Sequence, residues 1–373
     1  MTTRSARAEQ LLWPFDELRR VGLRALATAT PFGRALVGRR SIRIPALLSL
    51  HATAAFALAL LAPSFLLALA PLALGVPHLA ADVRYLLVRR ASPRWWLAAS
   101  AGFALALVAL RALAEAKLKF APSLAFEQGV ASAWVLVGAL GGCVAARGLV
   151  ARGLDASAAR RGIARGGLAL AAAAGVAAFA IGAPASFRMA LLHGHNLIAV
   201  AVWALLFRRG GRLGWLPVVM VLVGAGLLAS GALLRVTLQH GALSVAGLHL
   251  FAAADWLGPG LSDSAAIAVA TSFAFLQSVH YAIWLVGVPA GDRPGEGGRS
   301  WRAAGRELVR DFTAPGVALI VALALLVAAA GIAQTGPTRR LFLSLATFHG
   351  WLELAALAYL FARGAARPVR PVP

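Results

Sequence analysis

Apolar runs long enough to cross a lipid bilayer constrain this chain more than any other feature. A helix needs about 20 residues, at 1.5 Å each, to span roughly 30 Å of hydrocarbon. Runs of that length follow one another along most of the sequence, which predicts an all-α, polytopic membrane protein of about ten helices. The predicted spans are residues 44–62, 65–88, 95–115, 130–150, 163–185, 187–207, 213–234, 265–288, 312–333 and 341–362.

Positive charge is concentrated in alternate connections between these runs. If the N-terminus is cytoplasmic, all but seven of the 36 basic residues lie on the cytoplasmic side, which favours an even number of spans with both termini inside. We therefore expect a multi-pass protein of a bacterial inner membrane. The net charge of +22 does not indicate nucleic-acid binding, because a nucleic-acid interface needs basic residues gathered on one solvated face. The expected partners are the lipid bilayer and an apolar, lipid-soluble small molecule.

The chain divides into three regions by composition. These are a basic cytoplasmic N-terminal segment (1–43), a transmembrane domain (44–363) and a cytoplasmic tail (364–373). In the first, Leu11, Phe15 and Leu18 recur at helical spacing beside Arg19 and Arg20, as in a helix lying on a membrane surface. A disordered basic tail fits this segment equally well.

The longest outer connection, residues 235–263, has an apolar middle from Leu243 to Ala254. Since lipid-exposed loops with unpaired backbone groups are excluded from hydrocarbon, we expect this stretch to lie in the membrane interface or to dip back as a re-entrant segment.

Titratable residues inside the predicted spans are the main functional candidates, because each costs at least a few kcal/mol in hydrocarbon. Six of the eight histidines fall within predicted hydrocarbon. The candidate metal ligands are His51, His78, His193, His280 and His349. The candidate catalytic or supporting residues are Asp82, Glu353 and Tyr281.

Helical spacing relates several of these residues. His78 and Asp82 are four apart, as are His349 and Glu353, so each carboxyl group shares a helix face with an imidazole that it can orient. Asp82 lies near the cytoplasmic end of its span and equally fits a position where it meets water or a neighbouring arginine. Glu353 also fits a purely structural role, in which it forms a hydrogen bond with His349.

A second pattern runs along the eighth span, where Gln277, His280, Tyr281 and Trp284 form one polar and aromatic stripe. This stripe must face protein or a cavity, although a hydrogen-bonded packing seam has the same pattern.

In the sixth span, His193 and His195 are two residues apart, which is about 200° of rotation around a helix. Both imidazoles cannot face one centre unless the helix breaks at Gly194. His193 shares its side with Ser186 and Asn196 and is the preferred ligand, while His195 fits a packing role as well as a ligand role.

Neutral imidazole is a common ligand for iron, copper and zinc. A histidine cluster among apolar helices therefore predicts a membrane-embedded metal site, with Fe(II) as the expected ion, that oxidises an apolar substrate. A non-haem iron dioxygenase is the enzyme class that this pattern favours.

One stretch resembles a known family. The sequence Gly75-Val76-Pro77-His78-Leu79-Ala80-Ala81-Asp82 is similar to the Gly-x-Pro-His-Gly-x-x-Asp signature of the Brp/Blh family of membrane β-carotene 15,15′-dioxygenases. The resemblance implies a polytopic fold, iron held by intramembrane histidines, and carotenoid cleavage. It carries over to Gly75, Pro77, His78 and Asp82, whereas Leu79 stands where the family has glycine. The resemblance covers about a dozen residues, from Gly75 to Leu86.

Three other functions fit the same residues. A proton-coupled transporter would use the histidines and Glu353 as a relay between helices. A bis-histidine haem protein would need two histidines at matching depth, such as His51 with His78 or His280. A non-catalytic membrane protein would use the histidines as interhelical hydrogen-bonding groups.

Overall fold

A computed structural model describes most of the chain. The described residues are 3–90, 92–117, 122–150, 156–208, 211–293, 295–296, 298 and 300–364. Of the predicted C-terminal tail, only Gly364 is among them, so the expectation for the rest of the tail lies outside the described residues.

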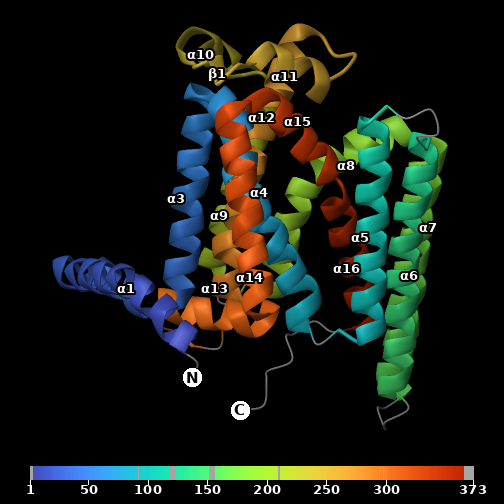
Figure 1. Cartoon of the computed structure of the whole chain (residues 1–373), viewed down its shortest axis with the longest axis horizontal. Coiled ribbons are helices and arrows are strands. Elements are labelled where there is room, and N and C mark those ends of the chain that lie inside the picture. Colours follow the sequence, from blue (N-terminus) through green and yellow to red (C-terminus); the bar gives the residue numbers. More distant parts are fainter. Residues whose placement is uncertain are drawn as a thin grey trace.

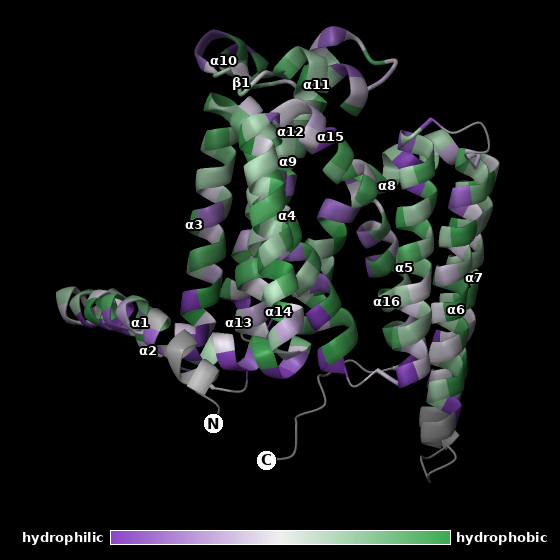
Figure 2. Ribbon diagram, in the orientation of Figure 1, coloured by the Kyte–Doolittle hydropathy of each residue, from purple (hydrophilic) through white to green (hydrophobic). Residues whose placement is uncertain are grey.

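The prediction of an all-α protein with ten long apolar helices is confirmed. The helical segments long and apolar enough to cross a membrane are Arg40–Leu61, Pro63–Arg90, Arg94–Glu115, Leu124–Arg147, Arg161–Gly182, Pro184–Phe207, Arg212–Ala229, Asp263–Gly291, Trp301–Ala333 and Thr335–Arg363. Figure 2 shows apolar residues along the helices and polar residues gathered mainly near their ends.

Most of the long helices are joined by short connections. Their bounds are α3 (Arg40–Leu61), α4 (Pro63–Asp82), α5 (Arg94–Glu115), α6 (Leu124–Val150), α7 (Ala156–Gly182), α8 (Pro184–Val202), α9 (Leu216–Ala229), α12 (Asp263–Ala282), α14 (Trp301–Ala333), α15 (Thr335–Leu345) and α16 (Phe348–Arg363). Proline begins α4 and α8 at Pro63 and Pro184, where its missing N–H and fixed φ suit a first helical turn.

Two apolar cores hold the bundle together. One joins α3, α4, α8, α9 and α12, and the other joins α5, α6, α7 and α16. Helix α16 also contributes Ala356 to the first core, so it lies at the junction of the two groups (Figure 1). Helix α12 is the central element, since nearly all of its side chains are buried.

Small residues allow α6 and α16 to approach closely. A side chain at Gly138 would have its Cβ 2.5 Å from the carbonyl oxygen of Ala355, and Gly142 lies against the backbone of Tyr359 in the same way. Gly138 and Gly142 are one helical turn apart, which is the spacing of small residues at close helix–helix contacts in membranes.

The N-terminal segment is helical in the residues that the structure describes. Helices α1 (Thr3–Ala29) and α2 (Pro31–Gly38) precede the bundle, and α1 projects sideways from one end of it (Figure 1). We call this end the α1 end. The Asp16 carboxylate accepts hydrogen bonds from the backbone N–H groups of Trp301 (2.5 Å) and Arg302 (3.3 Å), which attaches α1 to α14. Burial raises the pKa of Asp16, but these hydrogen bonds hold it below its ordinary value of 3.8.

The opposite end carries the long connection, and we call it the hairpin end. Helix α10 (Leu234–His240) leads into strands β1 (Ser244–Val245) and β2 (Leu248–His249) and then helix α11 (Leu250–Leu257). Residues Ala246 and Gly247 both have positive φ, of 50° and 77°, which fits a two-residue hairpin turn. An all-helical prediction misses this hairpin. Helix α11 packs against α12 through buried Leu250 and Leu257, so the apolar stretch caps the bundle.

An ion-pair network closes the α1 end. Arg89 contacts Asp292, Glu307 and Asp311, and Arg84 also contacts Asp311. These residues come from the end of the second span, the loop after the eighth, and α14. Helix α14 is interrupted at Thr313, whose φ is 64°, so the segment that bears the acidic residues turns away from the membrane-spanning part.

Candidate metal centre

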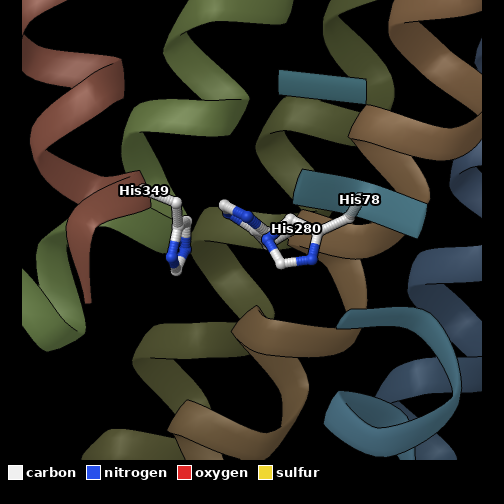
Figure 3. Close-up of side chains that lie close together, drawn as sticks. All are labelled: His78, His280 and His349. Atoms are coloured by element: carbon white, nitrogen blue, oxygen red, sulfur yellow. The ribbon is translucent and has the colours of Figure 1, made fainter. Parts of the chain in front are cut away.

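Four imidazoles from four different helices meet inside the bundle. His78 lies on α4, His195 on α8, His280 on α12 and His349 on α16. The ring centroids of His78 and His280 are 5.1 Å apart, and those of His78 and His349 are 5.0 Å apart. His195 is 5.1 Å from His280 and 4.9 Å from His349. Figure 3 shows His78, His280 and His349 pointing toward a common space. We call these four residues the histidine cluster.

The spacing of the nitrogens suits a metal ion. One nitrogen from each of His78, His280 and His349 lies within 4.8 Å of the other two. Two nitrogens bound to one ion at about 2.1 Å are at most about 4.2 Å apart, so small side-chain rotations would bring the ligands to bonding distance.

The helices that carry three of these rings share a local feature. Each of α4, α8 and α12 runs into a π-helical turn at the α1 end, at Val83–Leu87, Trp203–Phe207 and Ile283–Gly287. Such turns are rare and, where they occur, are frequently at functional sites. His349 lies in the first turn of α16, just after the break from α15, and its Nδ1 is 2.5 Å from the carbonyl oxygen of Ala346.

Two buried carboxyl groups lie behind the imidazoles. Asp82 is 4.0 Å from His78 Nε2, and Glu353 is 4.0 Å from His280 Nε2. Neither carboxyl group has measurable solvent exposure. Trp284 Nε1 donates a 2.9 Å hydrogen bond to Glu353. The His78–Asp82 pair is the i, i+4 pair expected from the sequence, whereas Glu353 contacts a histidine of another helix.

Tyr281 completes the wall of the site. Its ring centroid is 4.7 Å from that of His78 and 5.8 Å from that of His280. The stripe predicted on the eighth span is confirmed as buried, since Gln277, His280, Tyr281 and Trp284 are all at most 5% exposed.

The buried polar atoms of the site are short of hydrogen-bond partners. Both ring nitrogens of His78 and of His280, and Nε2 of His349, make no hydrogen bond of ordinary distance and angle in the described part of the chain. The same holds for both oxygens of Asp82 and for Oε2 of Glu353. A buried polar atom without a partner costs about 1–3 kcal/mol, and native proteins contain few of them. This concentration of unpartnered imidazole and carboxylate atoms fits a metal ion, because both groups are metal ligands.

A cavity of about 580 Å³ opens beside the cluster. All four clustered histidines and Tyr281 line it, and it continues between the helices to the helix ends at the hairpin end, where Glu115, Arg188 and Arg340 lie. Most of its surface is apolar. Its volume is within the usual range of small-molecule sites. A lipid-soluble molecule would therefore have room beside the histidines.

Two histidines that the sequence places among the ligands lie apart from this centre. His51 Nε2 is 3.1 Å from the carbonyl oxygen of Ser278, on a different side of α12 from the cluster. His193 Nε2 is 2.8 Å from the carbonyl oxygen of Leu257, and its ring packs against Phe273. Both imidazoles already have backbone partners, so the structure does not group them with His78, His280 and His349.

His195 takes the position that sequence reasoning assigns to His193. Helix α8 is continuous through Gly194, so the two imidazoles point in different directions, as a rotation of about 200° requires. Asn196, which the sequence places on the side of His193, lines the cavity together with His195, so no local pattern identifies His195 as the inward-facing residue.

The glycine of the Gly75–Asp82 motif has a packing role next to the site. The ring of Phe342, which lines the cavity, lies against Gly75 so closely that a side chain there would collide with it. Gly75 thus lets α15 approach α4 one turn before His78.

Comparison of the chain with family profiles, with curated proteins and with solved structures finds no match.

Proposed function

We propose that this protein is a membrane-embedded oxygenase in which the histidine cluster binds iron and an apolar lipid or carotenoid-like molecule is the substrate. The observation that supports it most directly is the set of unpartnered nitrogens on His78, His280 and His349, which face one another between buried carboxyl groups. Imidazole nitrogens with carboxylates nearby are characteristic ligands of non-haem iron.

His78, His195, His280 and His349 would be the ligands in this proposal. Asp82 and Glu353 would orient His78 and His280 by accepting hydrogen bonds from their second ring nitrogens, which fixes the tautomer and strengthens the ligand. Trp284 holds Glu353 in place for this role.

Iron would supply the activation of dioxygen. In the cleavage reaction that we propose, a carbon–carbon double bond breaks and each of its carbons takes one oxygen atom of O₂, so that two carbonyl groups form and no further reductant is needed. The protein's own contribution is to bind the chain along the cavity, to place its double bond beside Tyr281 and the histidines, and to keep water away.

The ten apolar helices and the charge distribution support insertion into a bacterial inner membrane with the α1 end on the cytoplasmic side. Helix α1 exposes Trp13, Phe15 and Leu18 and carries Arg20 and Arg24, as expected of a helix at the lipid surface.

Metal content and the visible spectrum of the purified protein test the proposal. We expect near-stoichiometric iron without a haem band in the wild type and in His51→Ala, and loss of iron in His78→Ala and His280→Ala. His51→Ala is the matched control because it removes another intramembrane imidazole. Folded wild-type protein that never contains a metal would refute the oxygenase and favour a proton relay through Asp82 and Glu353. A haem band would favour the haem protein.

A further inference from the structure

We infer that the cavity binds a molecule with an apolar chain and an anionic end, a carboxylate or a phosphate, and that Arg339 holds that end. Arg339 lines the cavity and is only 2% exposed. An arginine is rarely so deeply buried unless it is paired. This residue does not belong to the histidine cluster, and nothing in the proposed iron site requires it.

One part of the Arg339 side chain has a structural role. Its Nε donates a 2.5 Å hydrogen bond to the carbonyl oxygen of Leu67 on α4. That oxygen is free because its helical partner would be the nitrogen of Pro71, which has no hydrogen. The Arg339 guanidinium also lies over the ring of Trp256, 5.1 Å from its centroid. These contacts fix the plane of the guanidinium.

One terminal nitrogen of the guanidinium lacks a partner. Arg339 Nη2 is buried without a hydrogen bond, and among the residues that the structure describes Arg339 forms no ion pair with a carboxylate. The two glutamates on the cavity wall are engaged elsewhere. Glu127 pairs with Arg111, and Glu115 accepts a 2.6 Å hydrogen bond from Ser344.

A buried cation without a counter-ion is costly, and a fixed guanidinium presents parallel donors that match a carboxylate or a phosphate. An anionic ligand would supply both the missing charge and the missing acceptor. The cavity therefore carries an anion-binding group at the side of an apolar chamber.

The position of Arg339 suits the end of a long chain. Arg188 and Arg340 are exposed at the outer end of the cavity, where positive charge attracts anions. Apolar side chains such as Phe342 line the same space, and His78 shares it. A chain held by its end at Arg339 would extend past the histidines. Only the idea that this ligand is the substrate of the histidine cluster rests on the proposed function.

Binding of simple amphiphiles to the purified wild-type protein in a non-ionic detergent tests the inference. The probes are palmitate, hexadecyl phosphate, hexadecanol and hexadecylamine, which share one chain and differ in the charge of the end. We expect at least one of the two anions to bind about tenfold or more tightly than hexadecanol, the ratio expected for a hydrogen-bonded charged group. Hexadecylamine should bind most weakly. Equal affinity of all four probes would overturn the inference without any variant.

Two variants test whether Arg339 causes the preference for anions over the alcohol. Arg339→Gln should reduce the anion-to-alcohol ratio to about one, whereas Arg340→Gln, the exposed neighbour, should retain most of it at high salt. If Arg339→Gln does not fold, Arg339→Lys keeps the positive charge and should retain a reduced preference. A full preference in Arg339→Gln would overturn the inference.

A metal ion in the cluster could also attract an anion, so the same probes are measured with His78→Ala. Retention of the anion preference in this variant supports Arg339 as the binding group, and its loss overturns that assignment. Because this readout does not need iron, absence of iron would refute the proposed function while leaving the anion site standing.

Discussion

Replacing His195 and His193 separately with alanine distinguishes the structural interpretation of α8 from the one that sequence alone favours. His195 lies 4.9 Å and 5.1 Å, centroid to centroid, from two other clustered histidines, whereas His193 bonds to the backbone of Leu257. The two residues share a helix and a residue type, so each variant is the control for the other.

The expected changes in iron affinity and in stability follow from these contacts. Loss of a group that only supports a metal ligand lowers affinity about 10–100-fold. Removal of a ligand itself should cost more than that, so His195→Ala should weaken iron binding by over about 100-fold, or roughly 2.8 kcal/mol at 1.4 kcal/mol per factor of ten. His193→Ala should leave iron affinity unchanged and cost stability of about 1 kcal/mol for one lost hydrogen bond.

Iron titration of metal-depleted protein, followed by thermal unfolding of the same samples, provides both numbers. Retained iron affinity in His195→Ala together with lost affinity in His193→Ala would refute the assignment of the fourth ligand. Equal retention in both would mean that three histidines suffice.

Three further perturbations test separate parts of the structure. Gly138→Val should destabilise the bundle by more than about 1–3 kcal/mol in thermal unfolding, because its side chain meets the α16 backbone, whereas Gly129→Val, with nothing within 4 Å, should have little effect. Trp284→Phe leaves one Glu353 oxygen without its donor and should cost about 1–3 kcal/mol of stability and lower iron affinity about 10–100-fold. The folded-state pKa of Asp16 is lowered, so its contribution to attaching α1 is complete above about pH 4, which is roughly the pKa of Asp16 in the unfolded chain. This contribution is lost as the pH falls through the lowered folded-state pKa. Protease cleavage of α1 should increase over that range in wild type, and Asp16→Asn should make it independent of pH.

The long helices are predictable from the sequence because hydrocarbon thickness sets their length and proline and charge mark their ends. The expected fourth, fifth and sixth spans all agree with the structure to within a few residues, except that α6 begins at Leu124 and so includes Glu127. That carboxylate is tolerated in the helix because Arg111 pairs with it, a contact between α5 and α6 that no local pattern reveals. The hairpin at Ala246 is missed for a different reason, since each of its strands has only two residues.

The histidine cluster is only partly predictable. The positions of His78, His280 and His349 in apolar runs identify them as candidates, because any buried imidazole needs a partner. The packing of α8 against α7 and α12 decides which face of α8 turns inward. The sequence of α8 carries a histidine on each of two nearly opposite faces, so it does not identify the inward one. A rotation argument therefore excludes a double role for His193 and His195 without choosing between them.

The position of Glu353 shows how tertiary packing changes the chemistry that a local pattern suggests. Spacing alone pairs it with His349 on the same helix face. In the structure, its Oε1 instead accepts the Trp284 hydrogen bond and lies 4.0 Å from His280. Asp82 does the same for His78 from within one helix. Each carboxylate thus supports a different histidine, and His349, whose Nδ1 faces a backbone carbonyl, needs no carboxylate to fix its tautomer. The unbonded Nε2 of His349 is then the nitrogen that would bind the proposed metal. Loss of the carboxylates should therefore weaken metal binding at His78 and His280 first.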